Sequence, residues 1–172
     1  MNLSLIGFTG TGKTEIGRLL AHRMECEFFD LDETLEAKAN QSVSEFLKKY
    51  GVEKFRDMET EVLAEILTGA GPFIIATGGG TLIRPANRTR LKNSTTAVWL
   101  KAKPETIWSR VQDKPYVAPI FFTRQDPLMA IRIEMSRREL HYEEASHWAI
   151  DVDGKAPCAV AEEIKKRIEV KT

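Results

Sequence analysis

The sequence predicts an α/β fold of three layers, in which helices cover both faces of a central five-stranded parallel sheet. Short apolar segments, typical of strands, alternate with longer segments whose apolar residues recur at helical spacing. The strand segments are apolar at consecutive positions rather than alternate ones, which indicates a sheet buried on both faces. With 172 residues, of which 42% are hydrophobic, the chain is expected to form one domain over residues 1–172.

The individual elements follow from local patterns along the chain. Five short apolar segments are expected to be strands, at residues 3–6, 27–30, 73–76, 97–100 and 148–152. Apolar residues at helical spacing predict helices at residues 14–24, 34–39, 43–50, 53–67, 104–111 and 157–170. Gly51 separates two of these helices. Residues 113–126 contain two prolines and show no period, which is typical of a functional lid.

Composition and charge exclude several classes of partner. Twenty-five basic residues balance twenty-five acidic ones, so no overall charge attracts the chain to nucleic acid or to an anionic membrane. Cys26 and Cys158 lie far apart and form neither a disulfide framework nor a metal-ligand cluster. No segment reaches membrane-spanning length or resembles a targeting signal. We therefore expect a cytoplasmic monomer without nucleic-acid or membrane partners.

A phosphate-binding motif lies between the first expected strand and the helix after it. Residues 7–14 read G-F-T-G-T-G-K-T, which matches the P-loop pattern G-x-x-x-x-G-K-[ST]. In such a loop, backbone N–H groups surround the phosphates, Lys13 contacts the β- and γ-phosphates, and the Thr14 hydroxyl binds Mg²⁺. The alternative is a glycine-rich turn that only links strand and helix. The motif predicts a P-loop NTPase fold with ATP bound by Gly10, Thr11, Gly12, Lys13, Thr14 and Glu15.

A P-loop alone does not specify a reaction, because GTPases, motor ATPases and small-molecule kinases share it. The guanine-reading pattern Asn-Lys-x-Asp is absent from the sequence, which disfavours a GTPase. Asp30-Leu31-Asp32 ends the second expected strand, and a period of two would place both carboxylates on one side. One could then reach Mg²⁺ and the other an attacking hydroxyl. The alternative is an acidic helix start, since aspartate caps helices readily.

Two further groups could face an acceptor. Arg56 and Glu59 lie three residues apart on an expected helix, close enough to pair, although an exposed ion pair of little energetic value would explain them too. Gly78, Gly79 and Gly80 follow the third expected strand. Their backbone could approach a ligand closely, or they could make a turn with positive φ.

Taken in order, these motifs resemble those of the shikimate kinase family. The set comprises G-F-T-G-T-G-K-T, F-D-L-D, F-R-x-x-E, T-G-G-G and, at residues 138–142, R-x-x-x-Y. The resemblance spans most of the chain and implies a nucleoside-monophosphate-kinase type of fold, with a substrate-binding region at about residues 31–60 and a mobile lid at about 113–126. It also implies phosphorylation of the 3-hydroxyl of shikimate, with ATP and Mg²⁺, in aromatic amino acid biosynthesis.

The resemblance implies roles for the acceptor residues. Asp32 would hold the shikimate hydroxyls and orient or deprotonate the 3-hydroxyl, while Asp30 would reach Mg²⁺ through water. Arg56 and Arg138 would bind the substrate carboxylate, because a guanidinium group matches two carboxylate oxygens at once.

It also implies supporting and nucleotide-binding roles. Glu59 would support Arg56, and the backbone amides of Gly78, Gly79 and Gly80 would face the substrate, with Gly79 as the central contact. Arg110 would stack on adenine, although a solvated helix face would also explain it, and Lys155 would provide a second contact to the nucleotide.

The sequence departs from the family's pattern at one position of the expected lid. The family carries an arginine directly before a proline there, whereas this chain has Ala118-Pro119. Losing a positive charge near the transferred phosphoryl group could lower the rate by orders of magnitude. Arg124 or Lys114 could replace the arginine when the lid closes. Otherwise the protein is a related small-molecule kinase with an altered substrate, or a weakly active or non-catalytic ligand-binding paralogue.

Overall fold

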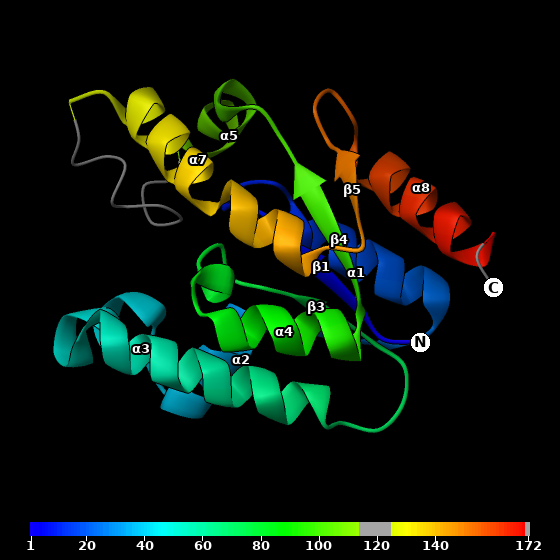
Figure 1. Cartoon of the computed structure of the whole chain (residues 1–172), viewed down its shortest axis with the longest axis horizontal. Helices are drawn as coiled ribbons and strands as arrows, with labels where there is room; N and C mark the ends of the chain where they lie inside the picture. The colour runs from blue at the N-terminus through cyan, green and yellow to red at the C-terminus, as the bar shows by residue number, and fades with distance from the viewer. Residues whose placement is uncertain (114–124, 171–172) are drawn as a thin grey trace.

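The computed structural model of the protein describes residues 1–113 and 125–170. Within these residues the strands are β1 (Leu3–Ile6), β2 (Glu27–Asp30), β3 (Phe73–Ala76), β4 (Thr96–Lys101) and β5 (Trp148–Asp151). They form one parallel sheet in the order β2-β3-β1-β4-β5 (Figure 1). The five-stranded parallel sheet confirms the prediction from the sequence.

Helices connect the strands, as a parallel sheet requires. They are α1 (Lys13–Met24), α2 (Leu31–Ala39), α3 (Val43–Leu67), α4 (Pro85–Ser94), α5 (Pro104–Val111), α7 (Pro127–Ala145) and α8 (Pro157–Glu169), and a 3₁₀ turn, η1 (Thr81–Ile83), precedes α4. Gly51 interrupts α3 with a φ of 82° and a ψ of 171°, so the helix is kinked where the sequence predicts a break. No helix of the described ranges is long and apolar enough to cross a membrane.

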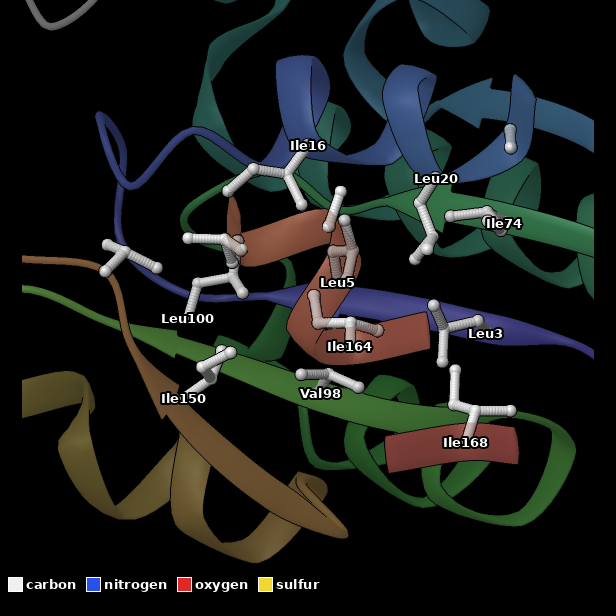
Figure 2. Packing of buried hydrophobic residues seen from close by; sticks show 14 of the residues in the cluster. Leu3, Leu5, Ile16, Leu20, Ile74, Val98, Leu100, Ile150, Ile164 and Ile168 are labelled. Carbon is white, nitrogen blue, oxygen red and sulfur yellow. The ribbon is translucent and has the colours of Figure 1, made fainter. Parts of the chain in front are cut away.

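Helices cover both faces of the sheet, as predicted. On one face, α1 and α8 pack against β1 and β4, and Figure 2 shows the side chains that form this cluster, among them Ile16, Leu20, Ile164, Ile168, Leu3, Leu5 and Val98. The other face is covered by α2, α3, α4 and α7, which contribute Leu31, Val62, Leu91 and Tyr142. Because both faces are buried, the residues available for chemistry lie at the ends of the strands.

The structure corrects the prediction at the end of β2. The strand ends at Asp30, and α2 begins at Leu31 rather than at residue 34. The Asp30 carboxylate accepts hydrogen bonds from the backbone N–H groups of Asp32 and Glu33, at 3.0 and 3.3 Å, and so caps the helix. Asp32 therefore lies in the first helical turn, and the strand period of two is wrong as the reason why the carboxylates come together.

The apolar pattern of the sequence does not reveal α4 or α7. In α4 the buried residues are Asn87 and Leu91, which are too few to produce a visible period. In α7 the side chain of Tyr142 is buried whereas that of Leu140 is exposed, so apolar residues occur around the helix rather than on one side. Both helices are held in place by packing against the sheet and the neighbouring helices, and this packing cannot be recognised from the local sequence.

Candidate active site

Among the described residues, those predicted to bind the phosphates and the acceptor come together at the carboxyl edge of the sheet, where parallel α/β sheets bind their ligands. The P-loop follows β1, the first turn of α2 follows β2, and the segment Gly78–Gly80, here called the glycine loop, follows β3. These three segments are neighbours because β3 pairs with both β1 and β2. Helices α3 and α7 add Arg56 and Arg138 to the same edge.

The P-loop is shaped by its glycines and by its own carbonyl groups. Gly10 and Gly12 have φ angles of 86° and 91°, in the left-handed region that glycine adopts readily. The backbone N–H and the hydroxyl of Thr11 both donate to the Phe8 carbonyl, at 3.3 and 2.8 Å. The loop therefore leads directly into the N-terminus of α1, whose partial positive charge favours phosphate.

Lys13 is buried within this loop. Its Nζ donates to the carbonyl groups of Gly7 and Phe8, at 2.8 and 2.9 Å. Burial lowers the pKa of Lys13 to about 8, although the carboxylates of Asp32 and Asp30 act in the opposite direction. The ammonium group is thus held in the phosphate-binding loop and is also influenced by the carboxylates of Asp32 and Asp30.

Thr14 and Asp30 form the oxygen-rich part of the site. The Thr14 hydroxyl donates to Oδ2 of Asp30 at 2.6 Å. No group of three or more histidine, cysteine, aspartate or glutamate side chains that could hold a metal ion is found in the described part of the chain. A hydroxyl and one carboxylate fit Mg²⁺, which fills the rest of its shell with phosphate oxygens and water.

Asp32 has the properties of a proton acceptor near neutral pH. The pKa of Asp32 is raised to about 6, chiefly by burial and then by the nearby carboxylates of Asp30 and Glu59, against the opposing effects of Lys13 and Arg56. A carboxyl group with this pKa is mostly ionised at pH 7 and is still more basic than an ordinary aspartate. Such a group is suited to general base catalysis.

Arg56 is held by a buried carboxylate. Its Nη1 donates to Oε2 of Glu59 at 2.6 Å, and Oε1 of Glu59 accepts a hydrogen bond of 2.7 Å from the Thr81 hydroxyl. The Glu59 side chain is 1% exposed, and Thr81 is fully buried. The guanidinium group lies 5.0 Å from the centre of the Phe55 ring. The pair is therefore not an exposed helix ion pair, and Arg56 is held in place.

The three glycines of the glycine loop are required by space rather than by backbone conformation. None has a φ in the left-handed region. A Cβ atom added to Gly78 would lie 2.9 Å from Oδ1 of Asp32, and one added to Gly79 would lie 2.5 Å from Oγ1 of Thr9 in the P-loop. A Cβ atom added to Gly80 would overlap the guanidinium group of Arg56. The loop thus brings Asp32, Arg56 and the P-loop into contact with one short stretch of backbone.

Arg138 connects α7 to both loops. Its Nη1 donates to the Gly79 carbonyl at 3.1 Å, and its Nη2 donates to Oε2 of Glu134 at 2.9 Å. The guanidinium group lies 5.2 Å from the centre of the Phe8 ring in the P-loop. Arg138 therefore reaches the glycine loop on which Arg56 also packs, although the two arginines come from helices far apart in the sequence.

The two residues predicted on the nucleotide side differ in position. Arg110 donates to the Gly10 carbonyl of the P-loop at 3.2 Å and to the Val152 carbonyl at 3.3 Å, and it is partly buried rather than solvated. Lys155 forms an ion pair of 2.7 Å with Glu163 on α8. Among the described residues, hydrogen bonds thus connect Arg110, but not Lys155, to the P-loop.

Comparison with known proteins identifies the family. The model of the family described as "Shikimate kinase" matches residues 9–169. A shikimate kinase of Symbiobacterium thermophilum is 36% identical over 169 residues, which cover 98% of this chain and 97% of the relative. The structure of shikimate kinase from Acinetobacter baumannii in complex with shikimate superimposes with a TM-score of 0.93 at 30% identity, covering 99% of this chain and 94% of that one. The chain belongs to the shikimate kinase family. It is therefore an ATP-dependent kinase that phosphorylates an alcohol group.

The departure of this chain from the shikimate kinase pattern concerns a segment that the structure does not describe. Lys114, Ala118 and Arg124 all belong to residues 114–124, outside the described residues. The lid prediction and the two possible replacements for the missing arginine thus remain predictions from the sequence.

No role is predicted from the sequence for two buried hydroxyl groups of the chain. The Thr81 hydroxyl donates to Glu59, and the Tyr142 hydroxyl donates to the Gly79 carbonyl at 2.8 Å. Only the second could have been indicated by sequence, because Arg138 and Tyr142 are four residues apart and a helix places such residues on one side. The pair is the R-x-x-x-Y motif at residues 138–142, but the apolar pattern does not show that this motif lies on a helix.

Proposed function

We propose that this chain transfers the γ-phosphoryl group of ATP to the 3-hydroxyl of shikimate, with Asp32, Arg56 and Arg138 binding the acceptor. The observation that carries this assignment is the convergence of one carboxylate of raised pKa and two arginines on the glycine loop, beside Lys13. Shikimate is a ring with a carboxylate at one end and hydroxyl groups at the other. Its carboxylate can pair with the two arginines, and its hydroxyl groups can donate to the carboxylate of Asp32.

In the proposed reaction, Asp32 accepts the proton of the 3-hydroxyl as its oxygen attacks the γ-phosphorus in line. A new bond forms between that oxygen and phosphorus, the bond to the bridging oxygen of ADP breaks, and ADP leaves with the electron pair. Lys13 offsets the negative charge on the phosphates. Thr14 and Asp30 would hold Mg²⁺, which supplies further charge neutralisation when bound.

Arg56 and Arg138 are proposed to bind the shikimate carboxylate. Replacing Gly80 with alanine is then expected to raise the KM for shikimate about tenfold or more, because the added methyl group displaces Arg56 from a charged hydrogen bond. Gly80 has a φ of −111°, which alanine also adopts, so a fall in the melting temperature would come from weakening of the buried Arg56–Glu59 pair and not from backbone strain. Steady-state kinetics and a thermal melt test this, and an unchanged KM for shikimate would argue against the role of Arg56.

The pH dependence of kcat/KM for shikimate is expected to be bell-shaped. Asp32 must be ionised, so activity falls as the pH decreases through about 6, and Lys13 must be charged, so activity falls as the pH rises through about 8. Measurement of kcat/KM at saturating ATP from about pH 5 to about pH 9 checks both limbs. An acid limb at the ordinary pKa of aspartate would contradict the proposed environment of Asp32.

An ADP-release assay with a panel of acceptors tests the proposed function. The purified protein is given ATP and Mg²⁺ with shikimate, quinate, aminoshikimate, gluconate or a nucleoside monophosphate, and Asp32→Ala is the control. Turnover with shikimate that is lost in the control is the expected result. Turnover only with another acceptor would show that shikimate is not the substrate, although the chain would still be a kinase of this family.

A second candidate function is a weakly active kinase, or a related kinase with another substrate. It is favoured by Ala118, which stands where the family carries an arginine. Supplying the family's arginine as Ala118→Arg is expected to raise kcat with shikimate about tenfold or more, because positive charge stabilises the transferred phosphoryl group. Ala118→Gln adds similar bulk without charge and should leave kcat near its original value. If neither the original chain nor Ala118→Arg binds shikimate, the related kinase with another substrate is the better assignment.

A further inference from the structure

Two donors from one side of α7 hold the Gly79 carbonyl group. The Tyr142 hydroxyl donates to it at 2.8 Å, and Nη1 of Arg138 donates to it at 3.1 Å. Tyr142 is 3% exposed, and its ring centre lies 5.7 Å from that of Trp99. Burial raises the pKa of Tyr142 to about 12, so the hydroxyl remains protonated and acts as a donor throughout the physiological range.

The position of this carbonyl determines the direction of the next N–H group. A peptide bond is planar, and in the trans form its C=O and N–H groups point in opposite directions. The described residues contain no cis peptide bond. Because the Gly79 carbonyl points toward Tyr142 and Arg138, the N–H of Gly80 points away from α7.

The N–H of Gly80, a buried residue, has no acceptor among the described residues. None of the hydrogen bonds formed among the described residues has this N–H as its donor. The missing side chain of Gly80 leaves room that the guanidinium group of Arg56 occupies. A buried or half-buried N–H group without a partner costs free energy unless a ligand or water accepts from it.

We propose that Tyr142 is a positioning residue for the acceptor, whose hydroxyl orients the Gly79–Gly80 peptide so that the Gly80 N–H faces shikimate. This inference rests on the proposed function, in which the glycine loop faces the acceptor. Tyr142 acts through the peptide and does not itself touch the substrate. The competing explanation is that the hydroxyl only stabilises the packing of α7 on the sheet.

Tyr142→Phe separates the two explanations, because it removes one oxygen atom and keeps the ring. We expect the KM for shikimate to rise about five- to tenfold, the effect of losing one well-placed hydrogen bond, while kcat and the KM for ATP change less than about twofold. Thr95→Val is the matched control. It removes another buried hydroxyl, at the opposite end of β4, which donates to the Leu91 carbonyl at 2.8 Å and also hydrogen-bonds the Ser4 hydroxyl at 2.7 Å. The variant should lower stability without changing the KM for shikimate.

A second measurement observes the peptide itself. The glycine loop contains the only Gly-Gly pairs of the sequence. Protein labelled with glycine carrying ¹⁵N and carbonyl ¹³C therefore gives two amide–carbonyl correlations in NMR, one for the Gly78–Gly79 peptide and one for the Gly79–Gly80 peptide. In Tyr142→Phe, the Gly79 carbonyl signal should move in the free protein, and the Gly80 amide should respond less to added shikimate than in the original chain.

The outcomes distinguish this inference from the proposed function. An original chain that neither binds nor phosphorylates shikimate would overturn the proposed function, and the inference with it. An original chain that does so, together with a Tyr142→Phe variant whose KM for shikimate is unchanged or whose loss matches that of Thr95→Val, would overturn the positioning role alone.

Discussion

Replacing Asp32 with asparagine is expected to lower kcat with shikimate by about 10²- to 10⁴-fold, the range observed when a general base is lost. Asparagine keeps the size of the side chain but cannot accept the proton of the 3-hydroxyl. The carboxylate is the group whose pKa is raised to about 6 by burial and by the charges of Asp30 and Glu59. Steady-state ADP release at saturating ATP and shikimate measures the loss.

The melting temperature and a matched variant separate this effect from unfolding. Because burial disfavours the charged form of Asp32, the neutral asparagine should not lower the melting temperature. Asp57→Asn changes an exposed aspartate on α3, paired with Arg84 at 2.7 Å, and should leave kcat within about twofold, as surface substitutions usually do. An Asp32→Asn variant that retained more than about a tenth of the activity would sink the general-base role.

Replacing Lys13 with methionine is expected to lower kcat by about 10²- to 10³-fold, the second large effect. Removal of one hydrogen-bond donor that stabilises charge in a transition state has an effect of this size. Methionine is close to lysine in shape, but the charge near the phosphates is lost, and the carbonyl groups of Gly7 and Phe8 lose their donor, so a thermal melt checks that the fold is kept. Shikimate should still bind, because Arg56 and Arg138 remain. Stopped assays with sensitive detection of ADP and calorimetry with shikimate measure the two effects.

The control for Lys13 is a lysine on the surface. Lys166, on α8, has a side chain that is 71% exposed, and Lys166→Met should leave both kcat and shikimate binding near their original values. If Lys13→Met lost shikimate binding and kcat together, the lysine would act in folding of the site rather than on the phosphates.

Much of the fold could be predicted from the sequence because the strands are buried on both faces. The first three strands, Leu3–Ile6, Glu27–Asp30 and Phe73–Ala76, have the predicted bounds. The P-loop was predictable because all of its residues lie in one continuous stretch of sequence, residues 7–14. Features set by local sequence could therefore be read without a structure.

The features that depend on contacts between distant segments could not be predicted. The glycine loop is explained by the side chains of Asp32, Arg56 and Thr9 that its residues touch, not by turn geometry. The Arg56–Glu59 pair is buried because Thr81 and η1 cover it, which the sequence spacing alone does not indicate. The raised pKa of Asp32 likewise results from burial created by packing.

A crystal structure of the protein with shikimate tests the central claim most directly. The account predicts the shikimate carboxylate within hydrogen-bond distance of Arg56 and Arg138, and the 3-hydroxyl within hydrogen-bond distance of Asp32 on the side that faces Lys13. Shikimate bound with its carboxylate away from both arginines, or with its hydroxyl groups away from Asp32, would contradict it.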